Sequence, residues 1–94
     1  MQTITLGTNA LKLSDDGGNS SPVVIRKTLI EAVSGVSGSD TNKASDLSHK
    51  ITLNMSSGRS IDIYLSEVSN KPLWTLNKAG VDNAVNDFYT FLNA

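Results

Sequence analysis

The chain has 94 residues, 38% of them hydrophobic and 18% charged, which is enough apolar material for one core and places it outside the disordered class. The absence of cysteine excludes a disulfide framework and thiolate metal sites. Eight basic against nine acidic residues argue against a protein that works by neutralising nucleic-acid phosphates.

The first two segments predict strands followed by a loop. Ile4 and Leu6 share one strand face, as do Leu11 and Leu13, with a break between the pairs at residues 7–9. We expect either a first hairpin or one long strand bent by a bulge at Gly7. Residues 14–21 (Ser-Asp-Asp-Gly-Gly-Asn-Ser-Ser) are rich in turn formers and predict a loop.

Residues 22–36 fit two interpretations. Ser21 and Pro22 would suit a helix start, followed by an apolar stripe at helical spacing. The β-branched run 23–25 instead suits a short strand, with a kink near residues 27–28 and a second strand over residues 29–33. We favour two strands because hairpin signals precede the segment. Residues 34–48 are mostly small and polar, and predict a long loop that is mobile or part of a contact surface.

The stretch from residue 50 to residue 65 gives the clearest pattern. Apolar residues alternate with polar ones over 51–55 and again over 61–65, and Ser56-Ser57-Gly58 interrupts them. A period of two places each apolar set on one strand face, and the short break containing Gly58 folds the strands back on each other. This is an amphipathic β-hairpin whose apolar face needs a cover.

A carboxy-terminal helix can supply that cover. Asn77 suits the N-cap position, and Leu76 is placed to pack on Val81 as a hydrophobic staple. One apolar stripe follows at spacings of three and four, and we expect Trp74 to help seal the layer; the stripe comprises Val81, Ala84, Val85, Phe88 and Leu92. The sequence thus predicts one α+β domain over residues 1–94. It is a small antiparallel β-sheet or partly open barrel of about four to six strands, with one C-terminal α-helix packed on it.

No motif indicates catalysis or a ligand site. His49 is the single histidine and is expected to be a polar residue at the start of a strand. The acidic residues near Asp15 lack calcium-loop spacing, and Gly17-Gly18 is not followed by a phosphate-binding pattern. We therefore expect no enzyme, no cofactor, no metal and no small-molecule substrate.

Binding surfaces are the remaining candidates. A basic patch of Arg26, Lys27, Lys50 and Arg59 beside Tyr64 would suit single-stranded nucleic acid, but one aromatic residue and nine acids disfavour that interpretation. Edge-strand docking through residues 3–6, contacts of the loop 34–48 and exposed aromatic residues at the end of the helix favour protein partners. The candidate interface residues are Thr3, Thr5, Asp40, Tyr64, Tyr89 and Phe91.

Two resemblances bear on function. Residues 21–33 with 51–63 resemble the strand-turn-strand plan of small β-barrel-like modules. Residues 67–75 (Glu-Val-Ser-Asn-Lys-Pro-Leu-Trp-Thr) with 79–85 (Ala-Gly-Val-Asp-Asn-Ala-Val) resemble small virion-associated proteins of tailed bacteriophages. That resemblance implies a structural protein of the capsid, neck or tail that binds copies of itself and other virion proteins. A phage-encoded regulatory binder of a host protein is the alternative.

The expected location follows from the same observations. No apolar run approaches the roughly 18 residues of a transmembrane helix. Residues 1–6 lack the basic start and long apolar stretch of a secretory signal. We expect a soluble protein, made in the host cytoplasm and incorporated in the virion, with no membrane contact.

Overall fold

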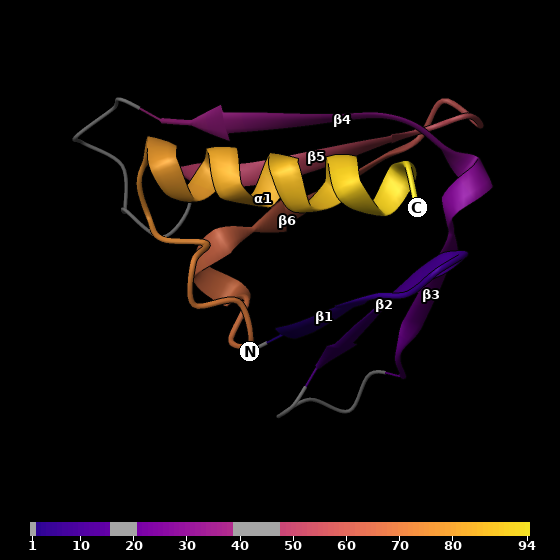
Figure 1. Cartoon of the computed structure of the whole chain (residues 1–94), viewed down its shortest axis with the longest axis horizontal. Coiled ribbons are helices and arrows are strands. Elements are labelled where there is room, and N and C mark those ends of the chain that lie inside the picture. The colour runs from indigo at the N-terminus through magenta and orange to yellow at the C-terminus, as the bar shows by residue number, and fades with distance from the viewer. Residues whose placement is uncertain (1, 16–20, 39–47) are drawn as a thin grey trace.

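The computed structural model describes residues 2–15, 21–38 and 48–94, and arranges them as strands and one helix in an α+β fold (Figure 1). The strands form two antiparallel three-stranded sheets, β1-β2-β3 and β4-β5-β6, and neither sheet closes into a barrel. The elements are β1 (Gln2–Leu6), β2 (Ala10–Asp15), β3 (Val23–Arg26), β4 (Ile30–Ser37), β5 (His49–Met55), β6 (Ser60–Tyr64) and α1 (Lys78–Leu92). The predicted fold class is confirmed, with two open sheets in place of one.

Of the two alternatives at Gly7, a hairpin and a bent strand, the structure shows the hairpin. Gln2 pairs with Asp15 and Leu6 pairs with Leu11, and the Gly7 N–H donates to the Ala10 carbonyl (2.9 Å). The chain therefore folds back at residues 7–10 instead of continuing as one bent strand. The predicted loop at 14–21 begins later than expected because β2 runs to Asp15, and residues 16–20 lie outside the described parts.

The ambiguous segment consists of two strands, as favoured. A one-turn 3-10 helix, Lys27–Leu29, redirects the chain from β3 to β4, and this turn divides the strands into two sheets. The predicted loop at 34–48 is wrong at its start because β4 continues to Ser37. Gly35 pairs with Ile51 in the sheet, so this glycine belongs to a regular strand and not to a loop. Residues 39–47 lie outside the described parts.

The β5–β6 hairpin has the predicted alternation and turn. Ile51 pairs with Ile63, and both side chains are buried. Gly58 closes the turn with a φ of 91°, a left-handed conformation that a Cβ atom disfavours. The Met55 N–H donates to the Arg59 carbonyl (2.8 Å) across this three-residue loop, which is a common hairpin connection.

Helix α1 packs on the β4-β5-β6 sheet, as predicted, but it lies over β4 and β5 and not over the β5–β6 hairpin alone. The Asn77 side chain accepts a hydrogen bond from the Gly80 N–H (2.8 Å), which confirms the N-cap, while Leu76 remains 45% exposed. The helix comes so close to β4 that a Cβ on Gly35 would lie 2.5 Å from Cγ1 of Val81. The core lies between the helix and the two sheets; it comprises Ile4, Leu11, Ile25, Ile30, Ile51, Leu53, Ile63, Leu65, Val68, Trp74, Val81, Ala84, Phe88 and Phe91.

Candidate protein interface

The predicted interface residues that the structure describes lie on three different elements, β1, β6 and α1. Thr3 and Thr5 share the face of β1 opposite the buried Ile4, and Thr5 is the more exposed of the two. Tyr64 is half-buried at the end of β6, where it pairs with Lys50. Tyr89 is 68% exposed on α1. Asp40 lies outside the described residues.

The prediction that Phe91 is exposed is wrong. Its side chain is 3% exposed and packs edge-to-face on Phe88, with ring centroids 6.4 Å apart. The ammonium group of Lys27 lies 5.8 Å from the centre of the Phe91 ring and donates to the main-chain oxygen of Ala94 (2.8 Å). Phe91 follows Phe88 by three positions and thus continues the buried stripe. The sequence pattern could not show that the first sheet would cover this end of the helix.

The free edge of β1 is occupied by the segment after β6. The Ser69 N–H donates to the Gln2 carbonyl (2.8 Å). The Asn70 amide brackets Ile4, accepting from its N–H at 3.0 Å and donating to its carbonyl at 2.9 Å. Val68 also forms a parallel bridge to Gln2. The backbone of β1 that faces away from β2 is therefore largely paired, which argues against docking through residues 3–6.

The edge of β4 is different. In an antiparallel sheet the backbone groups of alternate residues point to the same side. Because the Gly38 N–H donates to the Ser48 carbonyl, the N–H and C=O groups of Val33, Gly35 and Ser37 point away from β5. In the described parts of the chain no strand pairs with this side of β4. Glu31 is the one charged residue of β4 and lies where the register shifts.

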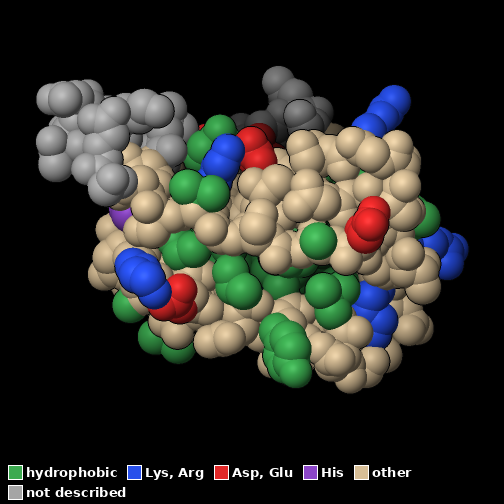
Figure 2. All heavy atoms as spheres, turned by 90° about the horizontal axis from the view of Figure 1, so that it is seen from above, with side chains coloured by type: hydrophobic (Ala, Val, Ile, Leu, Met, Phe, Trp, Pro, Cys, Tyr) green, Lys and Arg blue, Asp and Glu red, His purple; other side chains and the backbone are tan. Residues whose placement is uncertain are grey.

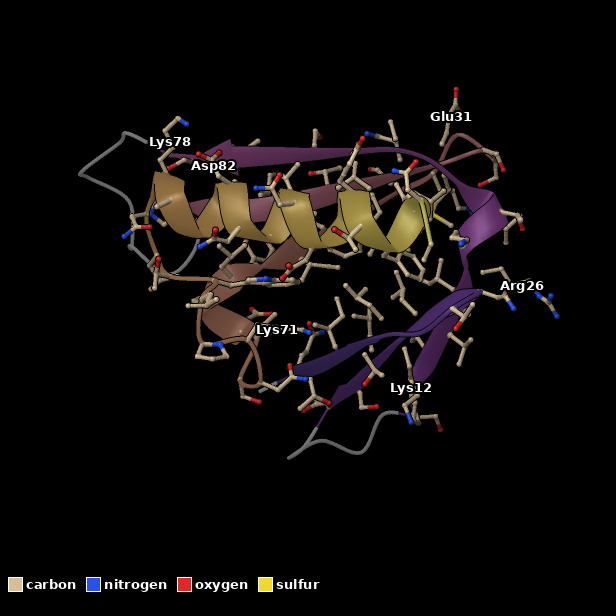
Figure 3. All side chains as sticks on the ribbon, viewed as in Figure 1. Lys12, Arg26, Glu31, Lys71, Lys78 and Asp82 are labelled. Atoms are coloured by element: carbon tan, nitrogen blue, oxygen red, sulfur yellow. The ribbon has the colours of Figure 1, made fainter. Side chains whose placement is uncertain are left out.

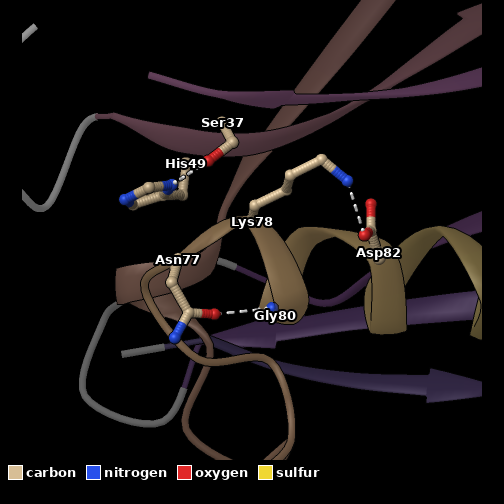
Figure 4. Close-up of polar contacts among 6 residues, drawn as sticks. All are labelled: Ser37, His49, Asn77, Lys78, Gly80 and Asp82. Carbon is tan, nitrogen blue, oxygen red and sulfur yellow. Dashed lines mark hydrogen bonds and ion pairs between the residues drawn. The ribbon is translucent and has the colours of Figure 1, made fainter. Parts of the chain in front are cut away.

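One flank of α1 lies beside this edge. The opposite flank faces residues 70–74, since the Trp74 indole donates to Asp87 (2.7 Å) and Asn83 donates to the Leu73 carbonyl (3.0 Å). The flank towards β4 carries the ion pair of Lys78 with Asp82 (2.9 Å), visible in Figures 3 and 4. Its remaining positions are apolar or aromatic: Val85, Tyr89 and Leu92.

These features together form what we call the β4–α1 surface. We define it as the outward backbone groups of Val33, Gly35 and Ser37 with the side chains of Val85, Tyr89 and Leu92. Figure 2, which looks down on this side of the molecule, shows hydrophobic side chains in a band through the middle of the face, with charged groups towards both ends. A backbone edge beside an apolar strip is the arrangement that accepts an added strand.

Sequence reasoning missed the β4 edge because three of the four residues 34–37 are Ser or Gly and suggest a loop. The one signal that could have indicated it was Gly35 placed after an apolar strand pattern, since a glycine within a strand often marks a close approach of another element.

Among the residues that the structure describes, the charged side chains do not form a binding patch comparable to the β4–α1 surface. Lys50 contacts Asp62 (3.2 Å), and the Thr52 hydroxyl donates to the same carboxylate (2.8 Å). The hydrogen bond from Thr52, followed by that from Lys50, lowers the pKa of Asp62. Lys27 is held at the end of α1, so the predicted basic patch is split. In Figure 3, Lys71 lies apart from Lys12 and Arg26, which are on the paired strands β2 and β3.

The remaining chemistry is sparse. His49 begins β5, as predicted, and its Nδ1 lies 3.1 Å from the Ser37 Oγ (Figure 4). A shallow groove of about 320 Å³ separates the end of α1 from the first hairpin, with Lys71 and Asp87 on its wall. Within residues 2–15, 21–38 and 48–94 no three His, Asp or Glu side chains come together as metal ligands would.

Comparisons with family models, curated proteins and solved structures found no match to this chain. None of the helices in the described segments has the length and apolar character needed to cross a bilayer.

Proposed function

We propose that this chain is a non-enzymatic structural or assembly protein that docks other proteins, copies of itself included, through the β4–α1 surface. The observation that carries the proposal is the edge of β4, whose outward backbone groups at Val33, Gly35 and Ser37 meet no other described strand. An incoming strand would gain main-chain hydrogen bonds from this edge and apolar contact from Val85 and Tyr89.

The particle of a tailed bacteriophage is the setting that we propose. Support comes from the resemblance of residues 67–75 and 79–85 to small virion-associated proteins, and from a surface that offers contact area without gathered reactive groups. The protein would then serve in capsid decoration, the neck or the tail, with other virion proteins as its partners.

Two measurements test the proposal. Light scattering on the purified chain should show association that increases with concentration, and mass spectrometry should find the chain in purified particles. A regulatory binder of a host protein would instead be absent from particles and would be recovered with one host protein. A strict monomer that binds no particle protein would contradict the proposed function.

A further inference from the structure

We propose that the partner at the β4–α1 surface is a second copy of this chain, related by a two-fold axis that passes beside Gly35. This inference rests on the proposed docking function and adds the identity of the partner and the geometry of the contact. Two-fold pairing is self-complementary, so one surface serves both copies. The two three-stranded sheets β4-β5-β6 would become one sheet of twice that width.

The backbone groups of β4 suit antiparallel pairing with themselves. The outward residues are evenly spaced about Gly35, so Gly35 would face Gly35 of the other copy and Val33 would face Ser37. Each such pair exchanges two hydrogen bonds, which gives about six across the interface. The register shift after Ile30 ends the regular edge at one side, which limits the pairing to one register.

The other strand edges are protected. The edge of β1 is covered by Ser69 and Asn70. The edge strand β3 has four residues, follows Pro22 and ends in Arg26. On β6, Asp62 places a carboxylate in the middle of a short strand. Charge, proline and short length are the usual means of preventing edge pairing, and β4 has none of them between Ala32 and Ser37.

The helices would meet as the strands pair. Helix α1 runs along β4 and β5 and packs mainly on β4 (Figure 1). With strands about 4.8 Å apart, two helices above the midlines of their β4–β5 pairs would lie about 10 Å apart across the axis, within the usual range for packed helices. Gly35 has no side chain to project between them.

The helix flanks are complementary in this arrangement. The helices would run antiparallel, so the second half of one flank lies against the first half of the other. Val85 and Tyr89 of one copy would then contact the stem of Lys78 and the neighbourhood of Asp82 in the other copy. An aromatic ring beside a lysine stem and its ammonium group is a favourable contact.

Sedimentation equilibrium on the full chain tests the inference with two variants. Ser37→Pro removes an N–H that points away from β5, and Tyr89→Lys replaces the ring with a charge facing Lys78 of the other copy. Each should weaken dimerisation by about tenfold or more, the loss typical of a central contact. If Ser37→Pro fails to fold, Tyr89→Lys still decides the result because its side chain is exposed.

Two matched control variants make the same kinds of substitution away from the β4–α1 surface. Val24→Pro removes an N–H of β3 that also points away from the neighbouring strand. The Lys27 N–H donates to the Asn9 carbonyl, and because alternate residues point to the same side, the N–H of Val24 points away from β2. Thr90→Lys adds the same charge on the opposite flank of α1. Both variants should dimerise as the unmodified chain does.

Amide hydrogen exchange gives an independent readout. In the dimer, exchange at Gly35 should slow by about tenfold or more with rising concentration, whereas an amide at the edge of β3, Val24, should not change. If the chain dimerises but neither Ser37→Pro nor Tyr89→Lys weakens the dimer, and Gly35 gains no protection, this interface is wrong. Self-association itself would still hold. If the chain is a monomer that binds a particle protein, the proposal that the partner is a second copy is wrong, but the proposed docking function stands.

Discussion

Replacing Gly35 with alanine tests how closely α1 lies to β4. The new Cβ would lie 2.5 Å from Cγ1 of Val81 and 2.9 Å from Cγ2 of Val85. Carbon atoms in contact are normally about 3.5–4.0 Å apart, so the helix or both valines must move by about 1 Å. Because β-branched side chains have few rotamers in a helix, they cannot easily turn away. We therefore expect the backbone to absorb part of the shift.

The expected loss of stability follows from two opposing effects. Overpacking in a close contact costs about 1–3 kcal/mol. Alanine also restricts the unfolded chain more than glycine does, which offsets about 0.4–1 kcal/mol. The net decrease in unfolding free energy is then about 0.5–2 kcal/mol. With an unfolding entropy of about 2.1 cal/mol/K per residue over 94 residues, Tm should fall by about 3–10 °C.

Thermal unfolding followed by circular dichroism measures this change, at a concentration low enough that Tm does not depend on it. Val81→Ala supplies the control, in the native background and in Gly35→Ala. Its cost should be smaller by about 1 kcal/mol in the Gly35→Ala background, because the truncated side chain makes room for the new Cβ. Unchanged or raised stability of Gly35→Ala, or equal costs of Val81→Ala in both backgrounds, would refute the close approach of α1 to β4.

Three further predictions concern other contacts. Asn70→Ala should lower the unfolding free energy by about 1–3 kcal/mol and speed amide exchange at Ile4, since two hydrogen bonds to that residue are lost; normal protection at Ile4 would contradict the covered β1 edge. Thr52→Val should raise the pKa of Asp62, measured by NMR titration, because the largest cause of its lowering is removed. A lowered pKa stabilises the fold above the pKa of the unfolded chain and loses that effect as the pH falls, so Thr52→Val should also make stability less dependent on acidic pH. Phe91→Ala should cost about 3–5 kcal/mol by chemical denaturation and Phe91→Leu clearly less, whereas an exposed ring would give almost no change in either case.

The contacts of the Asp62 carboxylate can be detected through its pKa, although they contribute little to the stability of the fold. The carboxylate lies on the outer face of the β4-β5-β6 sheet and is screened by water, so the contacts with Thr52 and Lys50 lower its pKa but stabilise the fold only slightly. Within the described segments, this face does not gather the basic residues that a nucleic-acid platform needs. Protein docking through the β4–α1 surface is therefore the proposal that the arrangement of charges favours.

The sequence by itself determined the elements whose causes lie within a few residues. Alternation over residues 50–65 specified both strands of the central hairpin, and Gly58 specified its turn. Asn77 marked the start of α1, and the spacing of Val81 and Phe88 specified which side of the helix would be buried. Each of these signals is local, because side-chain periodicity and capping act between near neighbours in the chain.

The tertiary structure decided the features that join distant residues. Asn70 covers the edge of β1 through contacts with Ile4, 66 positions away, and no local pattern indicates that pairing. Phe91 is buried in one cluster with residues of the β1-β2-β3 sheet, such as Ile4 and Leu11, and helical spacing alone does not specify that layer. Packing of the whole chain likewise leaves the outer edge of β4 without a neighbour among the described strands. Whether a strand gains a neighbour depends on where the rest of the chain packs, and that is set by burial of the whole core rather than by the residues of the strand.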